Sequence, residues 1–249
     1  MAELAIPEAG AAHVWWARRQ DASARHEGLL DDVERQRWTS YRQAADRERF
    51  LVGCSLAKTV LAAYAGQRPA DVRFDRTCGQ CGQPHGKPIL AGGGLAHSVS
   101  HSGDLVAVAV AADPVGVDVE QLDDRVRPLG GDGGDPRALA TLVFSAAEQA
   151  SLDVVPPADR GRAFLVGWTR KEAVTKATGD GVRAKFSDVV VAGAPGAPRL
   201  VAWPYPQPPQ SVSLLDLEAA PGYVAALAVL GPCATVQARD GSALLAAGT

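Results

Sequence analysis

The pentapeptide Gly116-Val117-Asp118-Val119-Glu120 is the stretch that most constrains how this chain folds. Side chains alternate between the two faces of a strand, so Asp118 and Glu120 share one face, roughly 7 Å apart, and the two valines share the other. One face therefore packs in a core while the other is anionic. The pentapeptide follows an apolar run at 105–112 and the turn Asp113-Pro114, which predicts a hairpin with its tip at that turn.

Two carboxylates at neighbouring positions on one face repel each other unless a cation or a basic group lies between them. Hard oxygen ligands of this kind suit Mg²⁺. The plainer alternative is a solvated strand end that carries two charges. A third carboxylate, Glu172, lies in a predicted helix and favours a metal site formed by Asp118, Glu120 and Glu172.

That helix is expected from about residue 159 to 178, with Gly179 as its stop signal. A spacing of four places its aromatic residues on the same face as Glu172 and Lys176; the face consists of Phe164, Trp168, Glu172 and Lys176. Glu172 and Lys176 could be an ordinary surface pair of a few tenths of a kcal/mol. Because they continue an aromatic face that should be buried, we expect them at the edge of a cleft instead.

Composition limits what the protein can bind and where it works. The 249 residues are 47% apolar, enough to bury a sizeable core. The net charge of −3 gives no global electrostatic case for nucleic acid or an anionic membrane, so we expect neither as a partner. There is no apolar run of membrane-spanning length and no secretory leader pattern. The four cysteines are too few for a disulfide scaffold, and we expect a cytoplasmic protein.

Residues 1–65 predict a strand followed by two helices. Residues 1–26, with Trp15 and Trp16, indicate an edge strand or loop. Asp31-Asp32 can cap a first helix, and a second helix is expected from Asp46 to Gly66.

The segment 78–88 is a loop by its glycine and proline content. Cys78, Cys81 and His85 offer three side chains of the types that bind zinc, but no fourth ligand is visible nearby, and reduced surface thiols are the favoured interpretation. The turn Gly86-Lys87-Pro88 that follows presents one ammonium group and open backbone to a flat ring or a phosphate.

Ser100-His101-Ser102 offers two hydroxyls and an imidazole as a grip on a phosphate. The alternative hypothesis is that this segment carries the nucleophile of a serine hydrolase. The segment lacks the Gly-x-Ser-x-Gly turn, however, and adjacent residues of a strand point to opposite faces. Ser100 and His101 are therefore badly placed as nucleophile and base.

The second half of the chain predicts a glycine-rich loop at 121–136, a short helix at 137–144, and a capping box at Ser145 and Glu148. Strands are expected at 187–191, 211–218 and 223–230, with an extended proline-rich connection at 203–209. The apolar run 224–230 echoes 103–110, which suggests an internal duplication.

The expected fold class is therefore α+β, with two similar halves related by pseudo-twofold symmetry. Each half would be a helix packed on a small antiparallel sheet, with the active cleft between the halves. We place the halves at residues 1–115 and 116–230, followed by a poorly ordered tail at 231–249, and expect a monomer.

Taken together, these motifs resemble a known family. Gly116 to Glu120, followed about fifty residues later by Trp168-Thr169-Arg170-Lys171-Glu172-Ala173-Val174-Thr175-Lys176, is similar to the paired signature of the 4′-phosphopantetheinyl transferases. Four further motifs resemble the Sfp-type branch: Gly86-Lys87-Pro88, Ser100-His101-Ser102, Phe144-Ser145 with Glu148, and Pro221-Gly222-Tyr223.

The resemblance implies an enzyme that moves the phosphopantetheine arm of coenzyme A onto a serine of an acyl, peptidyl or aryl carrier protein or domain and releases adenosine 3′,5′-bisphosphate. By position, Asp118, Glu120 and Glu172 would hold Mg²⁺ against the pyrophosphate, and Glu172 would take the proton from the carrier serine. Lys176 and His101 would contact phosphates. The adenine and 3′-phosphate end would be lined by Gly86, Lys87, Pro88 and Ser100.

The chain also departs from the family pattern. His97-Ser98 replaces the usual aromatic-Asn pair, and Cys54 follows Gly53 where many relatives carry an arginine, which leaves Arg49 as a candidate phosphate contact. Two other functions fit the same residues: a Mg²⁺-dependent phosphohydrolase or nuclease, and a catalytically silent module that binds carriers.

Overall fold

The computed structural model describes residues 4–79, 81–122, 136–181, 184–193, 196–205 and 211–247. The expected loop at 121–136 lies outside this set at 123–135, as does the proline-rich connection at 206–209. Helices and small sheets together form an α+β protein. The chain divides into two compact units, one formed by Met1–Val115 with Cys233–Thr249 and the other by Gly116–Pro232.

The first unit contains a four-stranded sheet in the order β11-β1-β5-β4 and a small ladder of β2 and β3. Its elements are β1 (Ala11–Arg18), the 3-10 helices η1 (Arg19–Asp21) and η2 (Ala24–Leu29), α1 (Asp32–Ser40), α2 (Ala44–Ala65), η3 (Pro69–Asp71), β2 (Phe74–Asp75), β3 (Ile89–Leu90), β4 (Ala96–Ser102), β5 (Leu105–Ala111), β11 (Thr235–Asp240) and α6 (Gly241–Ala247).

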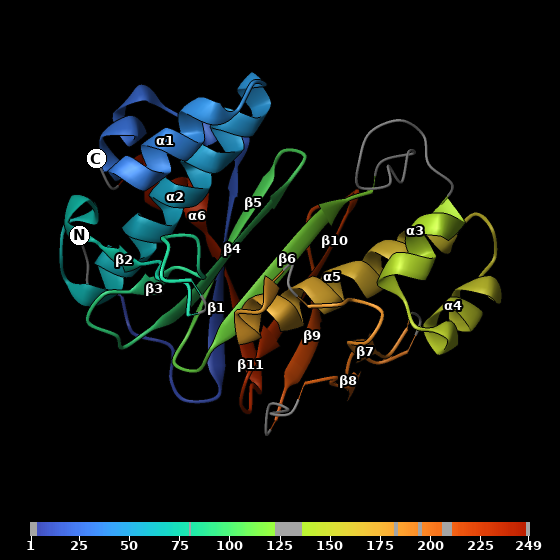
Figure 1. The fold of residues 1–249 in the computed structure, drawn as a ribbon. Helices are drawn as coiled ribbons and strands as arrows, with labels where there is room; N and C mark the ends of the chain where they lie inside the picture. The colour runs from blue at the N-terminus through green and yellow to red at the C-terminus, as the bar shows by residue number, and fades with distance from the viewer. Residues whose placement is uncertain are drawn as a thin grey trace. The chain divides into compact units, whose positions relative to one another are not determined.

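Helix α2 forms the core of the first unit. It packs against β4 and β5, and α6 packs against both α2 and β1 (Figure 1). Their shared core contains apolar side chains from α2, β1, β5 and α6, among them Val52, Leu56, Val60, Trp15, Val108 and Leu245. The helix ends at Gly66, whose φ of 62° is the left-handed conformation that glycine adopts without a steric penalty.

Charged side chains tie α1 to α2. Asp31 accepts a hydrogen bond from the amide of Glu34, and Glu34 accepts one from the amide of Asp31, each at 2.9 Å. Glu34 also accepts from the buried Lys58 Nζ at 2.6 Å and from Arg76 at 2.5 Å. Removing one partner of such a buried set leaves an uncompensated charge, so this cluster is a stability element of the first unit.

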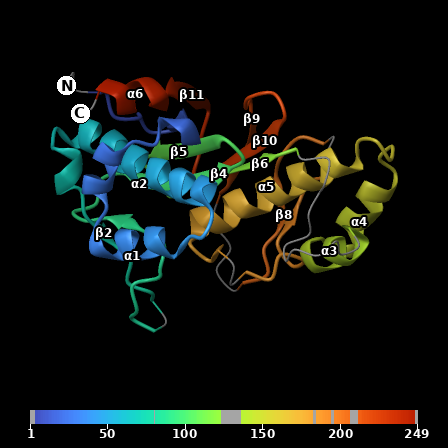
Figure 2. The same cartoon turned by 90° about the horizontal axis from the view of Figure 1, so that it is seen from above.

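The second unit contains a three-stranded sheet in the order β6-β10-β9 and a two-stranded ladder of β7 and β8. Its elements are β6 (Val115–Gln121), α3 (Pro136–Val143), α4 (Ala146–Asp153), α5 (Arg160–Thr178), β7 (Val190–Val191), β8 (Leu200–Ala202), β9 (Ser213–Leu217) and β10 (Tyr223–Val229). Helix α5 runs along this sheet against β10 and β9 (Figure 2). Ala173, Val174 and Ala177 of the helix are buried against Ala226 and Ala228 of β10.

Several sequence predictions of local structure are confirmed. Asp31 caps α1, Gly66 ends α2, Ser145 and Glu148 form a capping box at α4, and Gly179 ends α5 with a φ of 84°. These signals are local, so they operate wherever the segment lies in the fold. None of the helices in the described residues combines the length and apolar content that a membrane span needs.

The predicted hairpin of 105–112 with 116–120 is wrong. Strand β5 lies between β1 and β4, so both of its hydrogen-bonding edges are occupied, and β6 pairs with β10 in a different sheet. The hairpin partner of β5 is β4, joined through Gly103 with a φ of 55°. The turn at Asp113-Pro114 therefore carries the chain from one sheet to another.

Two other predictions about the first unit are also wrong. Strand β1 is not an edge strand, because it pairs with β5 on one side and with β11 on the other. The tail is not poorly ordered, because β11 completes the sheet as a parallel neighbour of β1 and α6 buries Leu245 in the core. The order of this segment comes from its pairing with β1 and its packing against α2.

Candidate functional site

Gly116 brings β6 and α5 into backbone contact in the second unit. A Cβ added there would fall inside the van der Waals radius of the Ala173 carbonyl oxygen and 2.5 Å from the amide nitrogen of Ala177. Only glycine permits this approach, which places the next residue on the same strand face, Asp118, beside the last turns of the helix. We missed this role of Gly116 in the sequence, although its position on the face of the two carboxylates was a usable signal.

Asp118 and Lys176 are joined directly by this packing. Lys176 Nζ lies 2.7 Å from Asp118 Oδ1 and also donates to the carbonyl oxygen of Val117 at 3.3 Å. The Asp118 side chain is only 4% exposed and that of Lys176 is 27% exposed. This ion pair of Lys176 therefore connects helix α5 to strand β6.

Electrostatics couple Glu172 to the same pair. Burial is the main reason that the pKa of Glu172 is raised to about 6; the charge of Lys176 opposes this rise, and the negative charge of Asp118 adds to it. Burial disfavours the charge of Lys176, but the carboxylates of Asp118, Glu172 and Glu120 outweigh it and raise the pKa of Lys176. We call these four residues, Asp118, Glu120, Glu172 and Lys176, the carboxylate cluster.

The carboxylates of this cluster are not closely gathered. Among the described residues, the set of three acidic, histidine or cysteine side chains whose ligand atoms lie within 4.8 Å of one another is Cys78, Cys81 and His85 in the first unit. Glu120 is partly exposed near the end of β6. The sequence-predicted residues of the second unit thus share one electrostatic environment without forming a closed ring of oxygens.

Lys171, next to Glu172 in the helix, has a different environment. Its fully buried Nζ donates to Glu148 Oε2 at 2.8 Å and to the carbonyl oxygens of Val143 and Phe186 at 2.9 and 2.8 Å. Glu148 in turn accepts from the amides of Ser145 and Val191. We call Lys171, Glu148 and these partners the closed cluster; it fixes α4 and β7 to α5.

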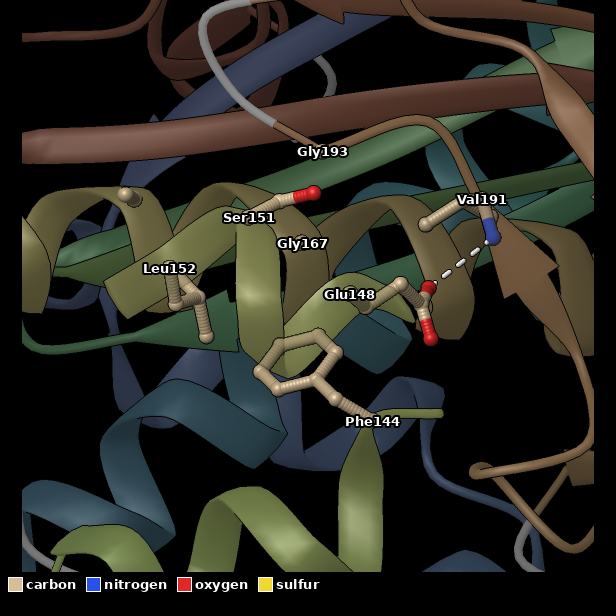
Figure 3. A pocket seen from close by; sticks show the side chains of 8 residues that line it. Phe144, Glu148, Ser151, Leu152, Gly167, Val191 and Gly193 are labelled. Atoms are coloured by element: carbon tan, nitrogen blue, oxygen red, sulfur yellow. Dashed lines mark hydrogen bonds between the residues drawn. The ribbon is translucent and has the colours of Figure 1, made fainter. Parts of the chain in front are cut away.

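A cavity of about 10 Å³ lies beside the closed cluster (Figure 3). Figure 3 shows the Glu148 carboxylate turned toward the Val191 amide, with the Phe144 ring below it. The ring fills the space over Gly167, where an added Cβ would lie 2.8 Å from a ring carbon. A volume of this size holds at most one water molecule, so this cavity is not a nucleotide site.

The motif Gly86-Lys87-Pro88 lies in the first unit. The Gly86 amide donates to the Arg76 carbonyl oxygen at 2.7 Å, and a Cβ there would lie 2.9 Å from the Thr77 carbonyl oxygen. Lys87 Nζ donates to the Val115 carbonyl oxygen at 3.1 Å, and burial lowers the pKa of Lys87 to about 8. A partly desolvated ammonium of this kind gains more from an anionic ligand than a fully hydrated one does.

Ser100 and His101 lie on opposite faces of β4, as expected from their adjacency, with Ser100 buried and His101 exposed. His97 on the same strand is buried against the Phe74 ring, with ring centroids 4.8 Å apart. Burial lowers the pKa of His97 to about 4, with a smaller contribution from the charge of Lys87. His97 is therefore a neutral ring that packs as the expected aromatic residue would.

Arg49, the candidate phosphate contact, donates to the Gly103 carbonyl oxygen at 2.8 Å and forms an ion pair with Asp46. It thus braces the turn between β4 and β5. Cys54, five residues further along α2, is a thiol whose pKa burial raises, so it offers no positive charge to a phosphate.

Comparison with known proteins agrees with these features. A family model described as the 4′-phosphopantetheinyl transferase superfamily matches residues 114–228. The 4′-phosphopantetheinyl transferase HetI of a Nostoc species is 35% identical over 190 residues, which cover 74% of this chain and 72% of HetI. The transferase Sfp of Bacillus subtilis is 25% identical over 66% of each chain, and AcpT of Escherichia coli is 32% identical over 55% of this chain and 60% of AcpT.

The HetI match includes most of both chains, and the family model includes β6, α5 and β10, the elements that carry and support the carboxylate cluster. The chain therefore belongs to the 4′-phosphopantetheinyl transferase family of enzymes.

Proposed function

We propose that this enzyme moves the 4′-phosphopantetheine arm of coenzyme A onto a serine hydroxyl of an apo carrier protein or carrier domain, with Mg²⁺, and releases adenosine 3′,5′-bisphosphate. The observation that carries the proposal is the meeting of β6 and α5 at Gly116, which couples Asp118, Glu172 and Lys176. Transfer of a phosphoryl group depends mainly on positioning and charge neutralisation, and this cluster offers both.

The donor chemistry of the cluster fits Mg²⁺. Three carboxylates act on the charge of one ammonium, so two negative formal charges are left over, and all three carboxylates are hard oxygen donors. Lys176 acts as a stand-in cation: its charge is stabilised by Asp118, Glu172 and Glu120 together. Asp118, Glu120 and Glu172 would hold the ion, which when bound neutralises charge on the pyrophosphate.

Glu172 is the proposed general base for the carrier serine, directly or through one water. A carboxylate with a pKa of about 6 is mostly ionised at neutral pH and is a stronger base than an ordinary glutamate. Lys176, already in the cluster, would contact the phosphates as a compact positive charge. Asp118 would then be the residue that positions Lys176 as well as a metal ligand.

The adenine and 3′-phosphate end of coenzyme A is assigned to Gly86, Lys87, Pro88 and Ser100, with His101 on a phosphate. Lys87 supports this assignment because its ammonium is partly desolvated, and His101 because its ring is exposed on β4. We further propose that the two halves are related by a pseudo-twofold axis with the active cleft between them, and that the enzyme acts as a cytoplasmic monomer.

Mass spectrometry of an apo carrier protein tests the activity. Incubation with the enzyme, coenzyme A and Mg²⁺ should add one phosphopantetheine group to the carrier, and omission of Mg²⁺ should prevent the addition. Glu172→Gln should reduce the rate by about 10³-fold, a typical loss for a general base. Glu218→Gln, at an exposed position of the same unit, is the matched control and should retain the wild-type rate.

Two results would count against the proposal. If acyl, peptidyl and aryl carriers all stay unmodified with Mg²⁺ present, the transfer reaction is excluded. Release of phosphate or nucleotides without any carrier would instead indicate a phosphohydrolase or nuclease.

A further inference from the structure

We propose that Cys78, Cys81 and His85 bind a zinc ion in the loop between β2 and β3. Their ligand atoms lie within 4.8 Å of one another, and Cys81 Sγ lies 2.9 Å from His85 Nε2. The sequence alone favoured reduced surface thiols because it offered no geometry. In the structure the histidine converges on the cysteine pair, which is the arrangement that a metal requires.

The spacing needs little adjustment to hold zinc. Zinc bonds of about 2.3 Å to sulfur and 2.1 Å to nitrogen place tetrahedral ligand atoms about 3.6 to 3.8 Å apart. Cys81 and His85 would therefore separate by about 0.7 Å from their present contact, using the same zinc bond lengths. Both side chains are exposed and can rotate, whereas Cys78 is buried and anchors the site.

The backbone of the loop forms a turn that holds the two cysteines together. The Gly82 amide donates to the Cys78 carbonyl oxygen at 2.8 Å, and the Cys78 amide donates to the Gln83 carbonyl oxygen at 2.9 Å. Gly82 has a φ of 70°, which permits the chain to reverse directly after Cys81. No disulfide joins the two cysteines.

The ligand types decide the metal. Two thiolates and one imidazole favour zinc over Mg²⁺, which takes oxygen ligands. Among the residues that the structure describes, no fourth acidic, histidine or cysteine side chain joins this group, so water would complete the tetrahedron. The site is thus chemically separate from the carboxylate cluster and can be loaded independently of it.

Zinc would order the segment that carries Gly86 and Lys87. The loop is closed at its base by the pairs Phe74 with Leu90 and Asp75 with Ile89, and the Gly86 amide adds a bond to Arg76. A metal at His85 would restrain the residue just before Gly86. This consequence rests on the proposed function, and it predicts that zinc lowers the KM for coenzyme A without acting in the chemical step.

Metal analysis of the full chain, purified without chelators, tests the site itself. We expect about one zinc per chain, and Co²⁺ substitution should give the absorption of a tetrahedral thiolate complex. Cys81→Ser should reduce both signals at least tenfold, whereas Cys233→Ser, outside the cluster, should leave them unchanged. Zinc-free preparations that also fail to bind Co²⁺, or a disulfide between Cys78 and Cys81, would overturn the proposal.

Hydrogen exchange separates this proposal from the proposed function. Removal of zinc with a zinc-selective chelator should speed exchange in residues 77–88 and leave β5 protected, and it should raise the KM for coenzyme A several-fold. Unchanged exchange in 77–88 would refute the ordering role. If the zinc-loaded enzyme with Mg²⁺ modifies no carrier, the transferase proposal fails while the metal content and exchange data still support the zinc site.

Discussion

Two charge clusters on the same helix, α5, differ in whether their positive and negative charges balance. In the closed cluster, Lys171 is fully buried, and its ammonium has three oxygen partners, of which the carboxylate of Glu148 is the one with a charge. Every charge there is matched and each partner comes from the protein. Such a set holds three segments together and has nothing to offer a ligand.

In the carboxylate cluster, which begins at the next residue of α5, three carboxylates face one ammonium group, so the charges do not balance. Glu172 has its pKa raised to about 6 because burial and Asp118 disfavour its ionised form. Adjacent residues of a helix point in directions about 100° apart, so Lys171 faces α4 while Glu172 faces the neighbourhood of β6. The comparison teaches that the imbalance of charge, more than the burial of charge, distinguishes the carboxylate cluster, the proposed cation site, from the closed cluster.

The largest expected effect comes from removing a charge of the carboxylate cluster. Asp118→Asn should lower transfer to a carrier by about 10³-fold, or ~4 kcal/mol, because it removes a proposed metal ligand and releases Lys176. The thermal unfolding midpoint should change little. Rates are measured by carrier mass and folding by circular dichroism. An active Asp118→Asn enzyme would remove the distinction between the two clusters.

The closed cluster should respond in the opposite way. Lys171→Met leaves Glu148 buried without its cation and should lower the free energy of unfolding by about 4 kcal/mol. Transfer by the molecules that remain folded should keep the wild-type kcat. Lys185→Met removes an ion pair with Asp188 at an exposed position, so urea denaturation should find almost no loss of stability.

Gly116→Ala perturbs the close backbone contact between β6 and α5 that brings Asp118 to Lys176. The added methyl group would overlap the backbone of α5 at Ala173 and Ala177, and this overpacking should lower the free energy of unfolding by about 3 kcal/mol. Transfer should also fall, because Asp118 is displaced from Lys176. Gly222→Ala is the control: an added Cβ there meets no atom within 4 Å, but the residue has a positive φ. It therefore measures the cost of replacing a glycine without the steric overlap. Equal effects of both variants would argue against a special contact at Gly116.

Local signals explain how much of this molecule the sequence predicted. The caps of α1 and α4 and the glycine ends of α2 and α5 depend on neighbouring residues, and all were predicted. The alternation in β6 predicted that Asp118 and Glu120 share a strand face. The four-residue spacing in α5 predicted that Glu172 and Lys176 lie on the same helix face as Phe164 and Trp168. These patterns are complete within about ten residues of sequence.

Partners far apart in the chain could not be predicted in this way. The continuous apolar run of β5 is the same whichever strand pairs with it, so its true partners, β1 and β4, were missed. The order of β11 depends on pairing with β1, more than two hundred residues earlier. The four-residue spacing separated Lys176 from Lys171, but nothing in the sequence indicated that Lys171 is buried in an ion pair. That role depends on Glu148, a partner from another helix.

The smallest predicted effect measures the charge imbalance itself, in protein freed of divalent metal. Because the pKa of Glu172 is about 6 in the folded protein and lower when unfolded, the folded state retains a proton that the unfolded state has lost between pH 4.5 and 6. Stability must therefore fall as pH rises through this window, by about 1 to 2 kcal/mol.

Glu172→Gln carries no such proton. The variant should match the wild type in free energy of unfolding near pH 4.5 and exceed it by about 1 to 2 kcal/mol above pH 6, because the linkage term is absent. Urea denaturation at several pH values, taken as the difference between the two proteins, cancels other titrating groups. Mg²⁺ should shrink the difference by stabilising the ionised Glu172. A difference that does not change with pH would mean that the carboxylate cluster is as balanced as the closed one, and that its charges hold the fold together instead of awaiting a cation.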